Sequence, residues 1–115
     1  MIPKLLFVLL LGTSTPAYAS DQLDLQIQLL LDLVSASNCS FIRNGNPHNA
    51  KESVKHISRK YAHYEQDIDS IVSLIELTAT NSPFTGKQYL VNCDGQVMSS
   101  EKWMHQQLIE LRRQA

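Results

Sequence analysis

The feature that most constrains the fold is a long apolar repeat in the middle of the chain. Between Asn49 and Ala79 no glycine or proline occurs, and apolar residues recur at alternating steps of four and three. The repeat consists of Ala50, Val54, Ile57, Tyr61, Tyr64, Ile68, Ile71 and Ile75. Residues with this spacing form one stripe along a helix. The pattern predicts one helix over 49–79, about 45 Å long, in preference to two helices broken near 63–66.

The segments on either side predict two further helices and a short hairpin. The stretch 22–36 lacks glycine and proline and is rich in leucine, and 101–113 carries apolar residues on one side. The stretch 88–93 is followed by Asp94-Gly95, which is a turn signal, and then by 96–98, so these residues predict a β-hairpin. The expected fold is mostly α, with three helices, a long central one among them, and a small β-hairpin.

The first residues have the three parts of an export signal. Lys4 is followed by an apolar run at 5–11, which is too short to span a bilayer, and Ala-Tyr-Ala at 17–19 is a typical cleavage site. We therefore expect a signal peptide at 1–19 and a single mature domain at 20–115. The mature protein is expected to be periplasmic or secreted, without a membrane anchor after cleavage.

Two cysteines, Cys39 and Cys93, lie in the expected mature part of the chain. An even number of cysteines in a small exported domain indicates a disulfide framework, here one bond near the hairpin. The alternative is a redox or catalytic pair, which the absence of a C-x-x-C motif disfavours.

Several residues resemble a family whose members are small exported proteins of Gram-negative bacteria. The run Cys-Ser-Phe-Ile-Arg-Asn-Gly at 39–45, the later Gly86, Tyr89 and Cys93, and Trp103 together carry the resemblance. It is the family of unknown function that includes YfeK-type proteins. The resemblance implies an exported helical domain with its two cysteines paired. It implies no established activity, so no catalytic residue can be transferred to this chain.

The rest of the sequence offers little recognisable chemistry. The formal net charge is −1, which gives no general electrostatic reason to expect nucleic acid as a partner. The chain lacks the nucleophile motifs of serine hydrolases and the glycine-rich loop that binds phosphates. His56 and His63 are seven residues apart, which is too far along a helix for one metal ion. We expect no catalytic residues, no metal and no cofactor.

A candidate binding surface comes from the two turns beside the cysteines. If Cys39 and Cys93 are bonded and their segments run antiparallel, residues four positions from each cysteine meet at one place. The candidate residues are Arg43, Asn44, Thr85, Lys87 and Tyr89. An arginine there could form a fork for a carboxylate or phosphate. The alternative is that Arg43 and Tyr89 bond to each other and only fix the loops.

These observations predict a small periplasmic binding or interaction module of unknown function. Its partner is expected to be an envelope protein or an anionic ligand. The alternatives are a structural or envelope accessory protein without a ligand and, less favoured, an enzyme that acts on the cell wall.

Overall fold

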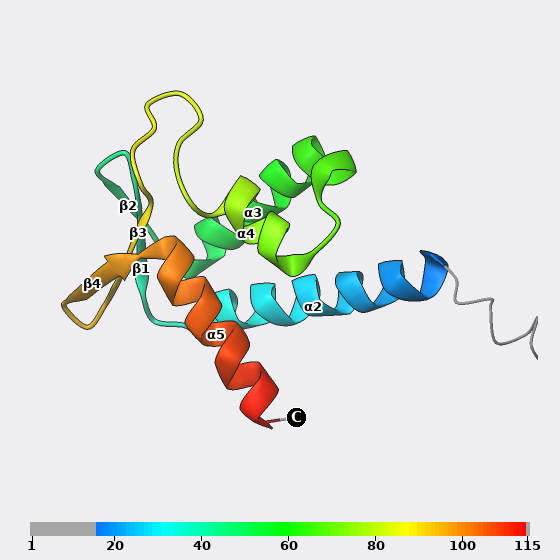
Figure 1. The fold of residues 1–115 in the computed structure, drawn as a ribbon. Helices are drawn as coiled ribbons and strands as arrows, with labels where there is room; N and C mark the ends of the chain where they lie inside the picture. The colour runs from blue at the N-terminus through cyan, green and yellow to red at the C-terminus, as the bar shows by residue number, and fades with distance from the viewer. Residues whose placement is uncertain (1–15, 115) are drawn as a thin grey trace, which may run out of the picture.

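The computed structural model describes residues 16–114, with side chains from residue 21 onward, so most of the expected signal peptide 1–19 lies outside the described residues. The elements are α2 (Pro16–Ala36), β1 (Ser40–Arg43), β2 (Asn46–His48), α3 (Ala50–Tyr64), the 3-10 turn η1 (Glu65–Asp67), α4 (Ile71–Thr78), β3 (Leu90–Cys93), β4 (Gln96–Ser99) and α5 (Ser100–Gln114). In Figure 1, α2 lies beneath α3 and α4, α5 crosses it, and the strands gather at one end. Within residues 16–114 no helix combines the length and apolar character needed to cross a membrane.

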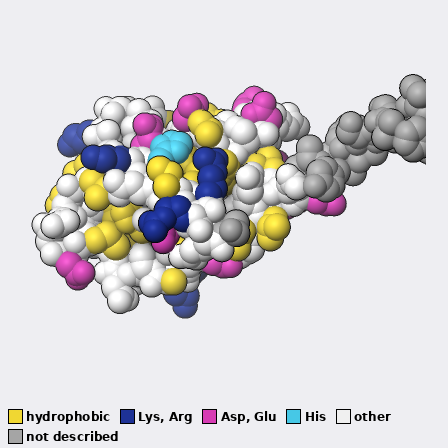
Figure 2. Space-filling model, turned by 60° about the horizontal axis from the view of Figure 1, so that its bottom comes forward, with side chains coloured by type: hydrophobic (Ala, Val, Ile, Leu, Met, Phe, Trp, Pro, Cys, Tyr) yellow, Lys and Arg dark blue, Asp and Glu magenta, His cyan; other side chains and the backbone are white. Residues whose placement is uncertain are grey.

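The apolar core lies between the four helices and continues to the sheet. Its most deeply buried side chains are Leu30, Val34, Leu74, Ile75, Val91 and Met104. Phe41 of β1 meets Trp103 of α5 edge to face, with ring centroids 5.5 Å apart, a geometry that adds about 0.5–1.5 kcal/mol to the burial of the rings. Outside the core, the face seen in Figure 2 carries both basic and acidic side chains among apolar ones.

The single long helix predicted over 49–79 is wrong, because this segment forms two helices, α3 and α4. The chain passes through η1 and an extended Ile68 (φ −104°, ψ 107°) before α4 begins. Ser70 is the N-cap of α4: its Oγ accepts a hydrogen bond from the Ser73 backbone N–H at 3.1 Å, and Ser73 Oγ accepts one from the Ser70 N–H. Reciprocal caps of this kind satisfy the free N–H groups of a helix start. The described residues therefore contain four α-helices in place of the expected three.

The apolar repeat misled the prediction because both helices turn their apolar sides to the same core. Ile57 of α3, Ile68 between the helices, and Ile71 and Ile75 of α4 are all buried. Each of two helices that pack on a shared core has its own alternation of apolar residues, so spacing that continues across a turn does not exclude a break. The break lies next to residues 63–66, where the alternative prediction of two helices placed it.

The predicted hairpin is confirmed as β3 and β4, but it belongs to a four-stranded antiparallel sheet in the order β2-β1-β3-β4. A second hairpin, β1 and β2, was not expected, because Asn46-Pro47 reads as a lead into a helix. Proline is tolerated in β2 because this is an edge strand. Both hairpins turn through two residues with positive φ, Asn44-Gly45 and Asp94-Gly95, the combination that two-residue hairpin turns require.

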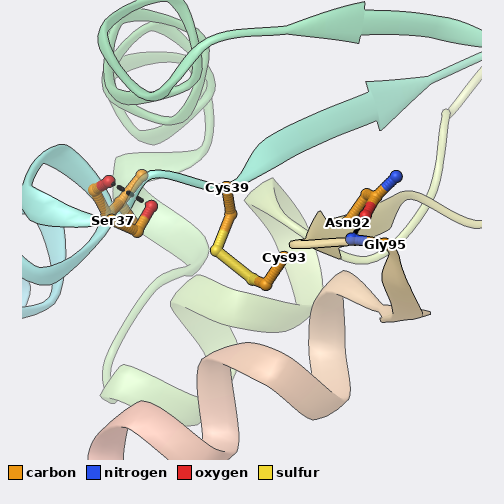
Figure 3. Close-up of a disulfide and its surroundings, with 6 residues drawn as sticks. Ser37, Cys39, Asn92, Cys93 and Gly95 are labelled. Atoms are coloured by element: carbon orange, nitrogen blue, oxygen red, sulfur yellow. Dashed lines mark hydrogen bonds between the residues drawn. A yellow bond between two sulfur atoms is a disulfide. The ribbon is translucent and has the colours of Figure 1, made fainter.

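The Cys39–Cys93 disulfide is confirmed and joins the two central strands (Figure 3). The Cα atoms of the two cysteines are 4.4 Å apart. In the β1–β3 register, Ser40 faces Asn92 and Ile42 faces Leu90, so the cysteines lie opposite each other at one end of the pair. The same register, continued by one residue at the other end, places Arg43 opposite Tyr89. The β1–β3 register, closed at its opposite end by the disulfide, therefore aligns the strand ends where Arg43 and Tyr89 lie.

Candidate functional site: a cationic cavity

A cavity of about 510 Å³ lies where the β1–β2 hairpin, α3 and the loop between α4 and β3 meet. Figure 1 shows this loop, in yellow, rising beside the β1–β2 hairpin. The lining residues are Arg43, Asn44, Asn46, His48, His56, Arg59, Lys60, His63, Tyr64, Ser82, Pro83, Phe84 and Tyr89. The volume is in the range of sites that hold small molecules.

The described lining has an unusual charge composition. Arg43, Arg59 and Lys60 contribute three cations, three histidines are added to them, and no aspartate or glutamate is present among the described lining residues. Within residues 21–114 none of the three cations forms an ion pair with a carboxylate. Glu52 is close by, but its carboxylate lies 3.9 Å from His48 Nδ1. The cavity therefore differs from the face in Figure 2, where both signs of charge occur.

Arg43 is half-buried at the end of β1, and its side chain is not neutralised by the described part of the protein. Its Nε is buried and has no hydrogen-bond partner. Burial lowers the pKa of Arg43; Tyr89 and, more weakly, Glu52 oppose this effect, and the positive charge of Arg59 adds to it. An arginine held in this way keeps unused donors, and the fork of its terminal nitrogens matches a carboxylate or phosphate. Among the described residues no hydrogen bond joins Arg43 to Tyr89, but the two side chains interact electrostatically, since Arg43 lowers the pKa of Tyr89 against the effect of burial.

Tyr89 lines the cavity and contacts two side chains of α3. It is buried, with 6% of its surface exposed. His56 meets its ring edge to face at 5.5 Å, and Lys60 Nζ lies 5.2 Å from the ring centroid. Burial and then the charge of Arg43 lower the pKa of Lys60. Burial, followed by Arg43 and the other nearby cations, lowers the pKa of His56 to about 3, so at neutral pH His56 is an uncharged donor and acceptor.

The loop between α4 and β3 closes one side of the cavity and is held by a set of hydrogen bonds. Thr85 Oγ1 donates to Asn44 Oδ1 at 2.7 Å, which joins the loop to the β1–β2 turn. Ser82 Oγ accepts from the backbone N–H groups of Phe84 and Thr85. The Gly86 N–H donates to the Ser82 carbonyl. These bonds fix the backbone that presents Phe84.

The cavity brings together three of the five residues selected from sequence. Arg43, Asn44 and Tyr89 line it, whereas Thr85 and Lys87 do not. Thr85 instead holds the loop through its bond to Asn44, and the side chain of Lys87 is exposed.

The contribution of α3 to the cavity was not predicted from the sequence. His56, Arg59, Lys60 and His63 line the cavity, and their spacing of three or four residues places them on one side of a helix. That spacing was a usable signal, but the sequence did not reveal that the β1–β2 hairpin would face it. No cluster of three or more histidine, cysteine or acidic residues able to hold a metal ion occurs among the side chains described.

Comparisons with known proteins give a family but no activity. The model of a family of unknown function (DUF5329) matches residues 21–112. The uncharacterized protein YfeK of Salmonella typhimurium is 34% identical over 61 residues, which cover 53% of this chain and 51% of YfeK. The chain thus spans about half the length of this relative. No solved structure matches the chain.

Proposed function

The chain belongs to DUF5329, a family of unknown function, and we propose that it is an exported binding module whose cationic cavity takes an anionic group. The Salmonella relative is named as an uncharacterized protein, so its name gives no information on activity. The proposal therefore depends on the chain's own residues.

The observation that carries the proposal is three cations in one cavity without a counter-charge. Arg43, Arg59 and Lys60 line a common space with no carboxylate among the described residues around it. Each cation raises the energy of the others: after burial, the charge of Arg43 lowers the pKa of Lys60, and the charge of Arg59 acts in the same direction on Arg43, where Tyr89 and Glu52 oppose it. An anion in the cavity would replace this repulsion by attraction, and attraction is stronger in a partly enclosed site than at an open surface.

Two further features support an exported protein. The N-terminal pattern of Lys4, an apolar run at 5–11 and Ala-Tyr-Ala at 17–19 is that of a cleaved signal. The Cys39–Cys93 disulfide is typical of an oxidising compartment. The intact mass of the protein recovered from the periplasm or medium tests this part: processing before Ser20 is expected, and retention of residues 1–19 would contradict it.

Isothermal titration of the mature protein with inorganic phosphate tests the binding proposal. We expect binding that weakens as the ionic strength rises, because salt screens the attraction. Lys60→Met keeps the aliphatic stem and removes the charge, so it should weaken binding at least tenfold. Lys55→Met is the matched control, because Lys55 is an exposed cation of the same helix that does not line the cavity.

A second variant guards against an effect of folding on the first. Arg43→Met removes the half-buried fork and should weaken binding by a similar or larger factor, with a circular dichroism spectrum like that of the parent. If inorganic phosphate, sulfate and citrate all fail to bind the parent protein at low salt, the proposal is wrong, and an accessory role without a ligand becomes the better description.

A further inference from the structure

Phe84 is an exposed aromatic side chain at the edge of the same cavity. It is 95% exposed, more than any of the other large exposed apolar side chains, Leu25, Leu29, Val72, Val97 and Ile109. A lone exposed apolar residue needs no explanation. Phe84, however, lines the cavity that holds the three cations. This position suggests a ligand with both an anionic and an apolar part.

The backbone around Phe84 is held in place by hydrogen bonds within the loop and to the β1–β2 turn. The Phe84 N–H donates to Ser82 Oγ at 3.3 Å, and Thr85 ties the next position to Asn44. The Ser82 N–H donates to the Lys87 carbonyl at 2.9 Å, which closes the loop behind it. A loop whose backbone is already fixed loses little backbone entropy when a ligand packs on its side chain, which favours binding.

The size of the cavity indicates that the anionic group is only part of the ligand. A bare phosphate ion would fill a small fraction of about 510 Å³. The lining also contains apolar surface from Pro83, Phe84, Tyr64 and Tyr89. A ligand that fills the space therefore has a body that can lie against aromatic and apolar side chains.

The charge of the cavity favours a phosphate ester over a carboxylate. A phosphomonoester carries a charge near −1.5 to −2 and offers three strong acceptor oxygens, whereas a carboxylate carries a single charge. Three cations and the uncharged His56 provide donors in excess of what one carboxylate can accept. The arginine fork of Arg43 suits two phosphate oxygens.

We infer that the ligand is a phosphomonoester with an aromatic group, its phosphate held by Arg43, Arg59 and Lys60 and its ring packed on Phe84. This inference rests on the proposed function, because it names the ligand class of the same cavity. A concave site between a hairpin, a helix and a loop fits a small molecule better than a flat membrane surface.

Titration of the mature protein with phenyl phosphate and methyl phosphate tests the inference. The two esters share the phosphate and differ in the ring. We expect phenyl phosphate to bind about tenfold more tightly, which corresponds to about 1.4 kcal/mol. In Phe84→Ala the ratio of the two dissociation constants should fall to about one. Val97→Ala is the matched control, because Val97 is an exposed apolar residue of β4 that does not line the cavity, and it should keep the tenfold ratio.

The outcomes separate this inference from the proposed function. Equal affinity of the parent protein for the two esters overturns the aromatic ligand but leaves an anion site in place. Failure of both esters to bind overturns the inference, and it overturns the proposed function as well only if inorganic phosphate, sulfate and citrate also fail to bind. If the Phe84→Ala variant keeps the tenfold ratio, the ring of the ligand does not pack on Phe84, and the inference is also overturned. Cosedimentation with vesicles of phosphatidylglycerol tests a lipid headgroup as the ligand. If the protein cosediments in a manner that depends on Phe84 and does not discriminate between the two esters, the ligand is a lipid headgroup and the small aromatic ester is refuted.

Discussion

Removal of the Cys39–Cys93 disulfide should cost this domain a large part of its stability. The two cysteines are separated by 54 positions. Closing a loop of this size lowers the entropy of the unfolded chain enough to raise its free energy by about 4 kcal/mol. Small domains have a total free energy of unfolding of about 5–15 kcal/mol. The double variant Cys39→Ala/Cys93→Ala should therefore unfold about 20 °C lower than the parent, at 4–8 °C per kcal/mol for a domain of this size.

Chemical denaturation followed by circular dichroism measures this difference directly. The reduced parent protein should match the double variant, and reductant should leave the double variant unchanged. Because the bond acts mainly on the unfolded state and the β1–β3 pairing still aligns the strands, phosphate affinity measured well below the melting temperature should change little. A loss of unfolding free energy below about 1 kcal/mol would refute the loop-closure reasoning.

Three further predictions concern pH, capping and ligand binding. Burial, together with Arg43 and its neighbours, lowers the pKa of folded His56 to about 3 from an ordinary 6.5. Between these two pH values the unfolded chain binds a proton that the folded protein does not. The stability should therefore fall as the pH drops from about 6.5 towards 3. His56→Gln should flatten this dependence in denaturation curves at several pH values, and His105→Gln should not. Ser70→Ala should cost about 1 kcal/mol by removing the N-cap of α4, whereas Ser58→Ala, at an exposed position within α3, should cost far less in the same assay. Inorganic phosphate at about 100 times its dissociation constant should stabilise the protein by about 2.7 kcal/mol, and an unchanged melting curve at that concentration would count against a site in the folded state.

Local signals in the sequence were sufficient for α2, the β3–β4 hairpin, α5 and the disulfide. The Asp94-Gly95 turn predicted the β3–β4 hairpin, because two-residue turns with positive φ need such residues. The even cysteine count, and the family resemblance with it, predicted the disulfide. The break after Tyr64 was harder to predict, because the apolar spacing continues through it. Its sequence signal is Ser70, the N-cap of α4, whereas the extended conformation of Ile68 is known from the structure alone.

The site was only partly accessible from sequence because it depends on tertiary pairing. Arg43 and Tyr89 could be placed together, since the disulfide and an antiparallel register determine their alignment. Lys60 and Arg59 could be placed on one side of a helix, but nothing local indicated that this side would face the β1–β2 hairpin. The sequence therefore supplied Arg43, and the fold added Arg59 and Lys60.

The cationic cavity and the disulfide have opposite effects on the stability of the free protein. Uncompensated cations disfavour the folded state, whereas the disulfide raises the free energy of the unfolded one. Arg59→Gln separates a binding role from a structural one, because Arg59 is exposed, lines the cavity and has no ion-pair partner among residues 21–114. If the cluster exists to bind an anion, this variant should lose affinity for phosphate while its unfolding free energy stays equal or rises by a few tenths of a kcal/mol, as expected for a surface change. A loss of more than about 1 kcal/mol would show that Arg59 stabilises the fold, and the charge cluster would then lose its value as evidence for a ligand.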